Sequence, residues 1–257
     1  MTPSPHRTRA VPRRRGSASH RTGILRLLAL VGLAGLLLLG AATGLTTTSP
    51  TTAPAPTGAP QSALATVPLL EVKGRAPKTG YSRDLFGNGW VDVDRNGCDT
   101  RNDVLGRDLT DRTYKPGTGD CLVLSGTLVD PYSASTISFV RGQATSAAVQ
   151  VDHVVALSDA WQKGAQAWDE PTRVAFANDP MNLLAVDGPL NAQKGDADTA
   201  TWLPPHRPYR CAYVARQVAV KHTYGLWVTD AERAAMVRVL TTCPDQALPD
   251  GSDLPPR

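Results

Sequence analysis

Five polar side chains near the middle of the chain are of types that could activate water and hold a metal ion. Asp152 and His153 are adjacent, Asn182 follows 29 residues after His153, Asn191 comes nine residues later, and Lys194 three residues after that. A neutral imidazole can take a proton from a water molecule. Carboxylate and amide oxygens suit a hard divalent cation, which could stabilise developing negative charge. The set therefore predicts metal-assisted hydrolysis.

The elements expected to position these residues are a strand, an intervening helix, a second strand and a further helix. The apolar run 147–157 predicts a strand that carries Asp152 and His153, and residues 182–186 predict a second strand. Asn191 falls in the first turn of the helix that follows, where a proline is tolerated because its missing N–H costs nothing. Neighbouring residues of a strand face opposite ways, so Asp152 and His153 can share a site only where the strand ends or bulges.

The remaining body of the chain predicts a mixture of short strands and helices, which is typical of the α+β class. Strands are expected at residues 121–129 and 137–141, and helices at residues 100–109, 160–177 (with a break at a proline), 209–222 and 229–243. Thr229 and Glu232 have the spacing of a capping box at the start of the last helix.

These segments resemble a known family. The motif VDHVVALSDAW…NDPMNLLAVDGPLNAQKGD and the flanking segments CDTRNDVL, DPYS…ISFVRG and TWLPP…RCAYVARQ are similar to the HNH nucleases, in the variant whose motif begins Asp-His and ends with Asn. The similarity is greatest to exported bacterial members that share the domain at the C-terminal end of GmrSD-type restriction enzymes. It implies a ββα-metal (His-Me finger) core inside one disulfide-bonded domain with flanking helices.

The resemblance also implies roles for the central residues. His153 corresponds to the general base, and Asn182 to the middle position, where a side-chain or backbone carbonyl fixes the tautomer of the imidazole; Asn178 is an alternative for that position. Asp152 and Asn191 correspond to the ligands of one divalent cation. Many HNH members have histidine where Asn191 stands, and an amide oxygen favours Mg²⁺, with Mn²⁺ as the alternative, over Zn²⁺.

The substrate implied by the resemblance is nucleic acid, with DNA favoured over RNA, and no small-molecule cofactor is implied. Lys194 could hold a phosphate as a point charge. Arg101 and Arg141 are further candidates for phosphate contacts. The chain is therefore expected to be a metal-dependent endonuclease that hydrolyses phosphodiester bonds. The alternatives are a nuclease-like envelope module without turnover and a toxin-type effector nuclease.

The first 45 residues have the pattern of an export segment. They contain seven arginines and no acidic residue, and residues 27–45 are an uncharged apolar run. A basic region followed by such a run predicts either a cleaved signal peptide or a membrane anchor, so the protein is expected to be secreted or held at the outer face of the membrane. Residues 46–66 predict a disordered Thr/Pro/Ala linker, residues 67–244 the domain, and residues 245–257 a flexible tail.

Net charge does not argue for nucleic-acid binding. Seven of the 27 basic residues lie in the leader, which leaves 20 against 23 acidic residues and a net charge of about −3 for the body. Any affinity for a polyanion must therefore come from local cations and a metal rather than from the overall field.

The four cysteines of the exported body predict two disulfides. Proximity in sequence favours the pairs Cys98–Cys121 and Cys211–Cys243 over the other two pairings. A zinc site is the rival interpretation, but the chain has no CxxC pair.

Three other interpretations are weaker. Residues 92–103 superficially fit a calcium loop, although the last position is Asp instead of Glu and turn chemistry explains the segment better. His206 and His222 are the other histidines of the body and could complete a three-histidine zinc site with His153. Ser158 could pair with His153 in a hydrolase, but the chain has no nucleophile-elbow motif.

Overall fold

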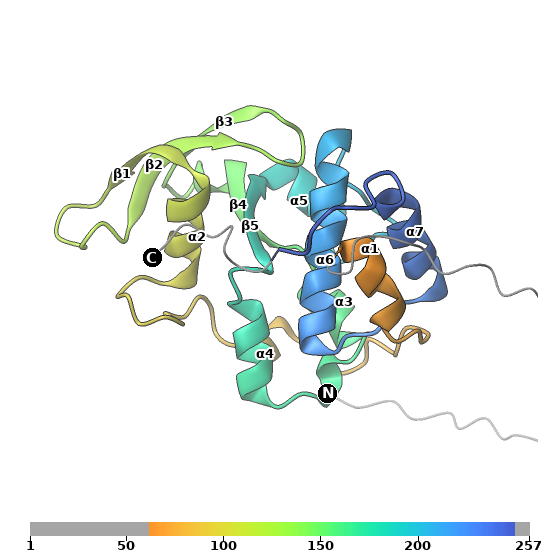
Figure 1. Cartoon of the computed structure of the whole chain (residues 1–257). Coiled ribbons are helices and arrows are strands. Elements are labelled where there is room, and N and C mark those ends of the chain that lie inside the picture. Colours follow the sequence, from red (N-terminus) through yellow and green to blue (C-terminus); the bar gives the residue numbers. More distant parts are fainter. Residues whose placement is uncertain (1–61, 250–257) are drawn as a thin grey trace, which may run out of the picture. The chain divides into compact units, whose positions relative to one another are not determined.

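The computed structural model describes residues 62–249 and has the expected α+β architecture in one disulfide-bonded domain (Figure 1). The expected export segment and most of the expected linker lie outside these residues. Within residues 62–249, no helix is long and apolar enough to cross a membrane.

The helices and strands follow one another as short elements. The helices are α1 (Ala63–Thr66), α2 (Thr100–Asp108), α3 (Leu157–Trp161), α4 (Glu170–Ala177), α5 (Gly188–Lys194), α6 (Arg210–Tyr224) and α7 (Asp230–Leu240). The strands are β1 (Thr110–Tyr114), β2 (Val123–Val129), β3 (Thr136–Val140), β4 (Val149–His153) and β5 (Leu183–Asp187). Strands β1, β2 and β3 form one antiparallel sheet in that order, and β4 and β5 form a separate antiparallel pair.

The pair β4–β5 and the helix α5 form the strand–strand–helix frame expected around the central polar residues. Asp152 is paired with Leu184 and His153 with Leu183, and His153 is the last residue of β4. The strand therefore ends at the position where two adjacent side chains can contribute to one site.

Strand β5 lies at the centre of the core, because both of its faces are buried. Leu184 and Val186 pack with residues of α1, α6 and α7, whereas Leu183 and Ala185 pack with α2 and the three-stranded sheet. Figure 1 shows these two groups of elements on opposite sides of the β4–β5 pair. Burial on both faces fixes the position of β5 and, through its hydrogen-bonded ladder, the position of β4.

The junction between β5 and α5 depends on a glycine. A Cβ atom at Gly188 would lie far inside the contact distance of the backbone carbonyl of Ala147. The absence of a side chain at Gly188 therefore lets α5 start against the segment that leads into β4. The side chain of Asp187 caps the helix by accepting a hydrogen bond from the N–H of Leu190 at 2.8 Å.

The boundaries expected for the linker and the tail were wrong by a few residues. Residues 62–66 were assigned to the linker, but Ala63 and Leu64 are buried against α6 and α7. Residues 245–249 were assigned to the tail, but Ala247 bridges to Ser62 and Leu248 packs on the same core. Composition alone predicted disorder for these two short segments. They are ordered by tertiary contacts, which composition does not reveal.

Two further expectations needed correction. The helix expected at 160–177 is two helices, α3 and α4, separated by a short 3₁₀ turn, and Pro171 lies in the first turn of α4. Strand β1 was not predicted, because its residues are mostly exposed and give no apolar alternation. The helices expected at 100–109, 209–222 and 229–243 were confirmed to within three residues at each end.

The disulfide pairs are Cys98–Cys121 and Cys211–Cys243, as proximity in sequence favoured. They span 23 and 32 residues, and loops of that length correspond to about 3 to 4 kcal/mol of stabilisation for each disulfide. The first ties the turn-rich segment before α2 to the start of β2, and the second joins α6 to the end of α7.

The segment that resembles a calcium loop is organised by its own hydrogen bonds. Asp92 accepts from the backbone N–H groups of Asn96 and Gly97, and the side chain of Asn96 donates to Asp94 and Asp103. This is turn chemistry. No group of three or more His, Cys, Asp or Glu side chains within the described part of the chain is arranged to hold a metal ion.

Candidate active site

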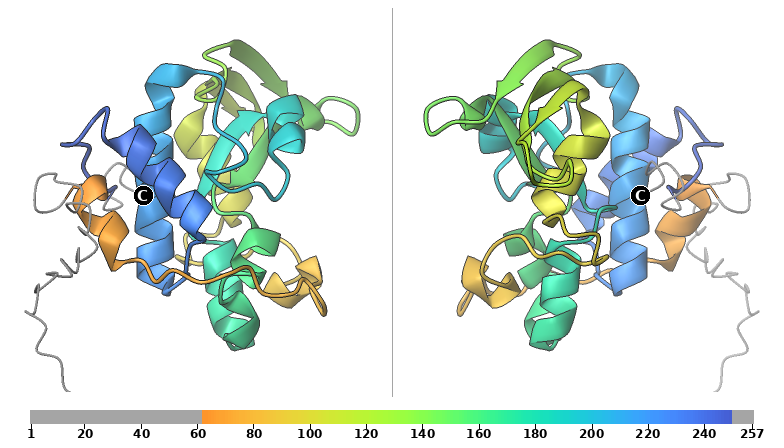
Figure 2. Two further views of the ribbon diagram at one scale, coloured as in Figure 1. Left: turned by 90° about the vertical axis from the view of Figure 1, so that its right-hand side faces the viewer. Right: turned by 90° about the vertical axis from the view of Figure 1, so that its left-hand side faces the viewer.

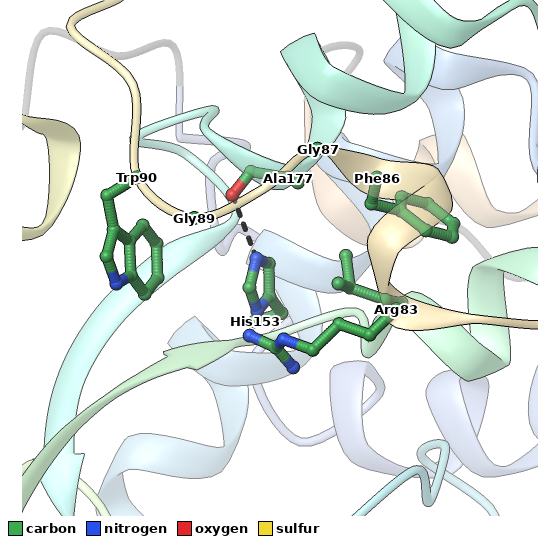
Figure 3. Close-up of a pocket in the computed structure, with 8 residues that line it drawn as sticks. Arg83, Phe86, Gly87, Gly89, Trp90, His153 and Ala177 are labelled. Atoms are coloured by element: carbon green, nitrogen blue, oxygen red, sulfur yellow. Dashed lines mark hydrogen bonds between the residues drawn. The ribbon is translucent and has the colours of Figure 1, made fainter.

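The imidazole of His153 is held in one orientation by a backbone carbonyl. Its Nε2 lies 2.8 Å from the carbonyl oxygen of Ala177, at the end of α4 (Figure 3). A carbonyl can only accept, so Nε2 carries the proton and Nδ1 of the neutral ring has a free lone pair. The indole of Trp90 stacks nearly parallel to the imidazole, with ring centroids 5.7 Å apart and planes 7° from parallel.

Burial keeps His153 neutral. Loss of solvation lowers the pKa of His153 to about 3, with the hydrogen bond to Ala177 opposing this and the charges of Arg83 and Lys194 contributing to it. His153 as a whole residue is 6% exposed. At neutral pH the imidazole is therefore unprotonated on Nδ1 and able to accept a proton.

Asp152 is a buried carboxylate with a partner on each oxygen. Its Oδ1 accepts from the ammonium of Lys194 at 2.9 Å, and its Oδ2 accepts from the hydroxyl of Tyr132 at 2.6 Å. Burial raises the pKa of Asp152, while the charge of Lys194 and the hydrogen bond from Tyr132 oppose that rise. A carboxylate has about four lone-pair directions, so these two bonds do not exhaust its capacity to accept.

Asn191 approaches β4 from the helix α5. Its Nδ2 donates to Oε1 of Gln150 at 2.8 Å. This bond orients the amide group, and the Oδ1 of Asn191 takes no part in it. Asn191, Asp152 and His153 line one recess of about 440 Å³, which we call the large recess. A carboxylate and an amide oxygen are hard donors of the type that suits Mg²⁺ or Mn²⁺.

Asn182 makes no hydrogen bond to the imidazole, contrary to the role expected for its side chain. Its Oδ1 accepts from the N–H of Val155 at 2.8 Å and its Nδ2 donates to the carbonyl of the same residue at 3.2 Å. Its backbone carbonyl accepts from Val154 at 2.8 Å. Asn182 therefore clamps the two residues that follow His153, and the carbonyl that orients the ring belongs to Ala177. Asn178 binds Val91 and Val174 and does not take this role either.

The ammonium group of Lys194 makes its hydrogen bonds inside the protein. Lys194 is 2% exposed, and its ammonium donates to Asp152 and to the backbone carbonyl of His153, both at 2.9 Å. The ammonium thus locks α5 to the end of β4. A contact between Lys194 and a substrate phosphate stays a prediction, and the observed geometry gives it no support.

Arg101 and Arg141 do not lie among the residues that line the recesses around His153. Arg141 donates to the carbonyl of Val123 and to Oδ1 of Asn102, and the guanidinium of Arg101 lies over the ring of Phe139. Both belong to the α2–β2–β3 part of the domain, so the structure does not bring them to the candidate site. Ser158 donates to Asp196 and makes no pair with His153.

Several residues of the site were not predicted from the sequence. A second recess of about 130 Å³, which we call the small recess, adjoins the large one and shares Arg83, His153 and Leu157 with it. Trp90 lines the small recess, and Tyr132 holds Asp152 from a cluster of aromatic rings. Tyr132 lies in the flanking segment DPYS, whereas no pattern in the sequence marked Arg83 or Trp90.

A buried network of charges fixes the loop after α5. Lys163 is fully buried and forms ion pairs of 2.6–2.8 Å with three carboxylates. The network consists of three cations and three anions, which are Arg75, Lys163, Lys221, Asp159, Asp198 and Glu232. Equal numbers of opposite charges and short distances allow such burial. The carboxylate of Glu232 is used here, so the predicted capping box is only half formed, by Thr229.

The fold and the site together define a domain with a strand–strand–helix frame that presents a neutral histidine beside a carboxylate and a carboxamide. Residues 99–239 match the family described as "GmrSD restriction endonucleases, C-terminal domain". The chain belongs to this family, as its central motif suggested.

The chain is also 37% identical over 210 residues to an "Uncharacterized secreted protein" of Arthroderma benhamiae, covering 81% of this chain and 98% of that protein. The expectation that this chain is a bacterial member of the family stays a prediction. No solved structure matches the chain.

Proposed function

We propose that the protein is an exported, metal-dependent endonuclease that hydrolyses phosphodiester bonds of DNA, with RNA as the alternative substrate. The observation that carries this proposal is the state of His153, because its Nε2 is fixed by Ala177 and its lone pair on Nδ1 is free. A base in this state can take the proton of a water molecule that attacks phosphorus. The family suggests an endonuclease, and the chemistry of the site agrees with that suggestion.

A divalent cation would be held by Asp152 and Asn191. When bound, it would offset the negative charge that develops on the phosphate oxygens and the leaving 3′-oxygen. Tyr132 and Lys194 would hold the carboxylate of Asp152 in one orientation. Gln150 would do the same for the amide of Asn191.

Export is proposed from three observations. The leader combines seven arginines with a long apolar run. The domain has two disulfides, which persist in oxidising compartments. A relative of 37% identity is described as secreted.

The proposal is tested with the protein secreted by an exporting host and purified in its oxidised form. Supercoiled plasmid and single-stranded RNA are incubated with the protein in Mg²⁺, Mn²⁺, Zn²⁺ or EDTA. We expect plasmid cleavage in Mg²⁺ and Mn²⁺ and none in EDTA. Plasmid that stays intact in every metal would refute the enzymatic proposal, provided that circular dichroism shows folded protein. Cleavage that persists in EDTA would refute the role of the metal.

A further inference from the structure

One wall of the site comes from a segment outside the matched family region. Residues 78–90, which we call the strap, precede residues 99–239 and contribute to both recesses. Figure 2 shows the chain after α1 passing along α3 and α4 before it reaches α2. The strap places Lys78, Tyr81 and Arg83 on the large recess, and Arg83 and Trp90 on the small one.

The two cations of the strap differ in their pairing. Lys78 forms an ion pair of 2.9 Å with Asp196 and lies over the ring of Tyr81. Arg83 is exposed, and within residues 62–249 it takes part in no ion pair and no side-chain hydrogen bond. In Figure 3 its guanidinium lies beside the imidazole of His153, on the side away from Ala177. Its charge is among those that lower the pKa of His153.

The backbone of Arg83 is anchored by a buried neighbour, whereas its side chain is exposed. Arg83 begins a short 3₁₀ helix, Arg83–Phe86, in which Phe86 is 2% exposed and packs on Trp161 and Phe176. The helix ends at Gly87, with φ of 97°, close to the side chain of Val174. The strap therefore places the guanidinium of Arg83 at the edge of the recess, on a backbone that is anchored in the core.

An exposed guanidinium that lines both recesses beside His153, with no ion-pair partner among residues 62–249, is placed to receive an anion that enters the site. A guanidinium offers a planar fork of donors that matches two oxygens of a phosphate. We propose that Arg83 binds the phosphate group of the substrate next to His153, and this inference rests on the proposed nuclease function. The strap would then form a part of the active site that precedes the matched family region in the sequence.

The test measures binding and turnover of a fluorescent DNA oligonucleotide with the secreted protein. In Mg²⁺, Arg83→Ala is expected to lower kcat/KM by on the order of 10²-fold, with Arg83→Lys intermediate because it keeps the charge without the fork. Arg238→Ala, which removes an exposed arginine of α7, is the matched control and is expected to change kcat/KM less than about 3-fold. Circular dichroism checks that each variant is folded.

Binding is measured by anisotropy with His153→Ala as the background, so that the substrate survives. Adding Arg83→Ala should reduce the slope of log Kd against log salt by about 1, because one phosphate contact is lost. Unchanged kcat/KM and slope would overturn the inference while leaving the proposed function intact. A change of slope with Arg101→Ala but not with Arg83→Ala would assign the contact to the other arginine and overturn it as well. An absence of cleavage by the wild-type protein in every metal would overturn the proposed function and this inference together.

Discussion

Replacement of Asn182 by alanine tests how the end of β4 is held. Asn182 is fully buried, and its side chain satisfies both the N–H and the carbonyl of Val155, which is 1% exposed. The variant leaves two buried backbone groups without a partner. Each such group costs about 1 to 3 kcal/mol, so the free energy of unfolding should fall by about 2 to 6 kcal/mol.

The assay is urea unfolding of the oxidised, secreted protein, followed by tryptophan fluorescence and circular dichroism. The same loss should lower Tm by about 4 to 24 °C for a domain of this size. Asn88→Ala is the matched control, because Asn88 is exposed on the strap and makes no side-chain hydrogen bond within residues 62–249; it should change stability by less than about 0.5 kcal/mol. A loss for Asn182→Ala below about 1 kcal/mol would refute the reasoning, because the clamp on Val155 would then contribute little.

Three further predictions concern the frame of the site. Gly188→Ala should destabilise the domain by about 1 to 3 kcal/mol in urea unfolding, because the added methyl group overlaps a backbone carbonyl; an unchanged unfolding midpoint would contradict this. Tyr132→Phe should weaken Mg²⁺ binding about 10- to 100-fold in calorimetry, because Asp152 loses the hydroxyl that holds it; equal affinity would show that the hydroxyl has no such role. Burial alone would raise the pKa of Asp198, but the hydrogen bond and charge of Lys163 and the charge of Arg75 lower it to about 2. The stability that the pairing of Asp198 contributes is therefore present above about pH 4 and is lost as the pH falls toward 2. Lys163→Met should remove this contribution, so that the loss of stability between about pH 4 and 2 becomes smaller in a pH titration of unfolding.

The sequence predicted the frame of the site because local rules determine it. Adjacent Asp152 and His153 require a strand end, and β4 ends at His153. The disulfides pair as expected because each closes a short loop. A proline in the first turn of α5 agrees with the helix expected there from the sequence.

The parts that the sequence did not predict depend on contacts between distant segments. The carbonyl of Ala177 reaches His153 from 24 residues away, and Tyr132 reaches Asp152 from 20 residues away. Helix α1 forms in a segment whose composition favours disorder, because its side chains are buried against α6 and α7. Sequence position likewise does not distinguish Arg83, which lies at the recess, from Arg101, which does not.

The rate of plasmid nicking in Mg²⁺ by wild-type protein and by His153→Ala tests the central claim most directly. His222→Ala serves as the matched control, since His222 is exposed on α6. We predict that His153→Ala slows nicking by about 10² to 10⁴-fold, because the base that activates water is lost, while His222→Ala leaves the rate unchanged. Nicking by a folded His153→Ala variant at the wild-type rate would contradict the account.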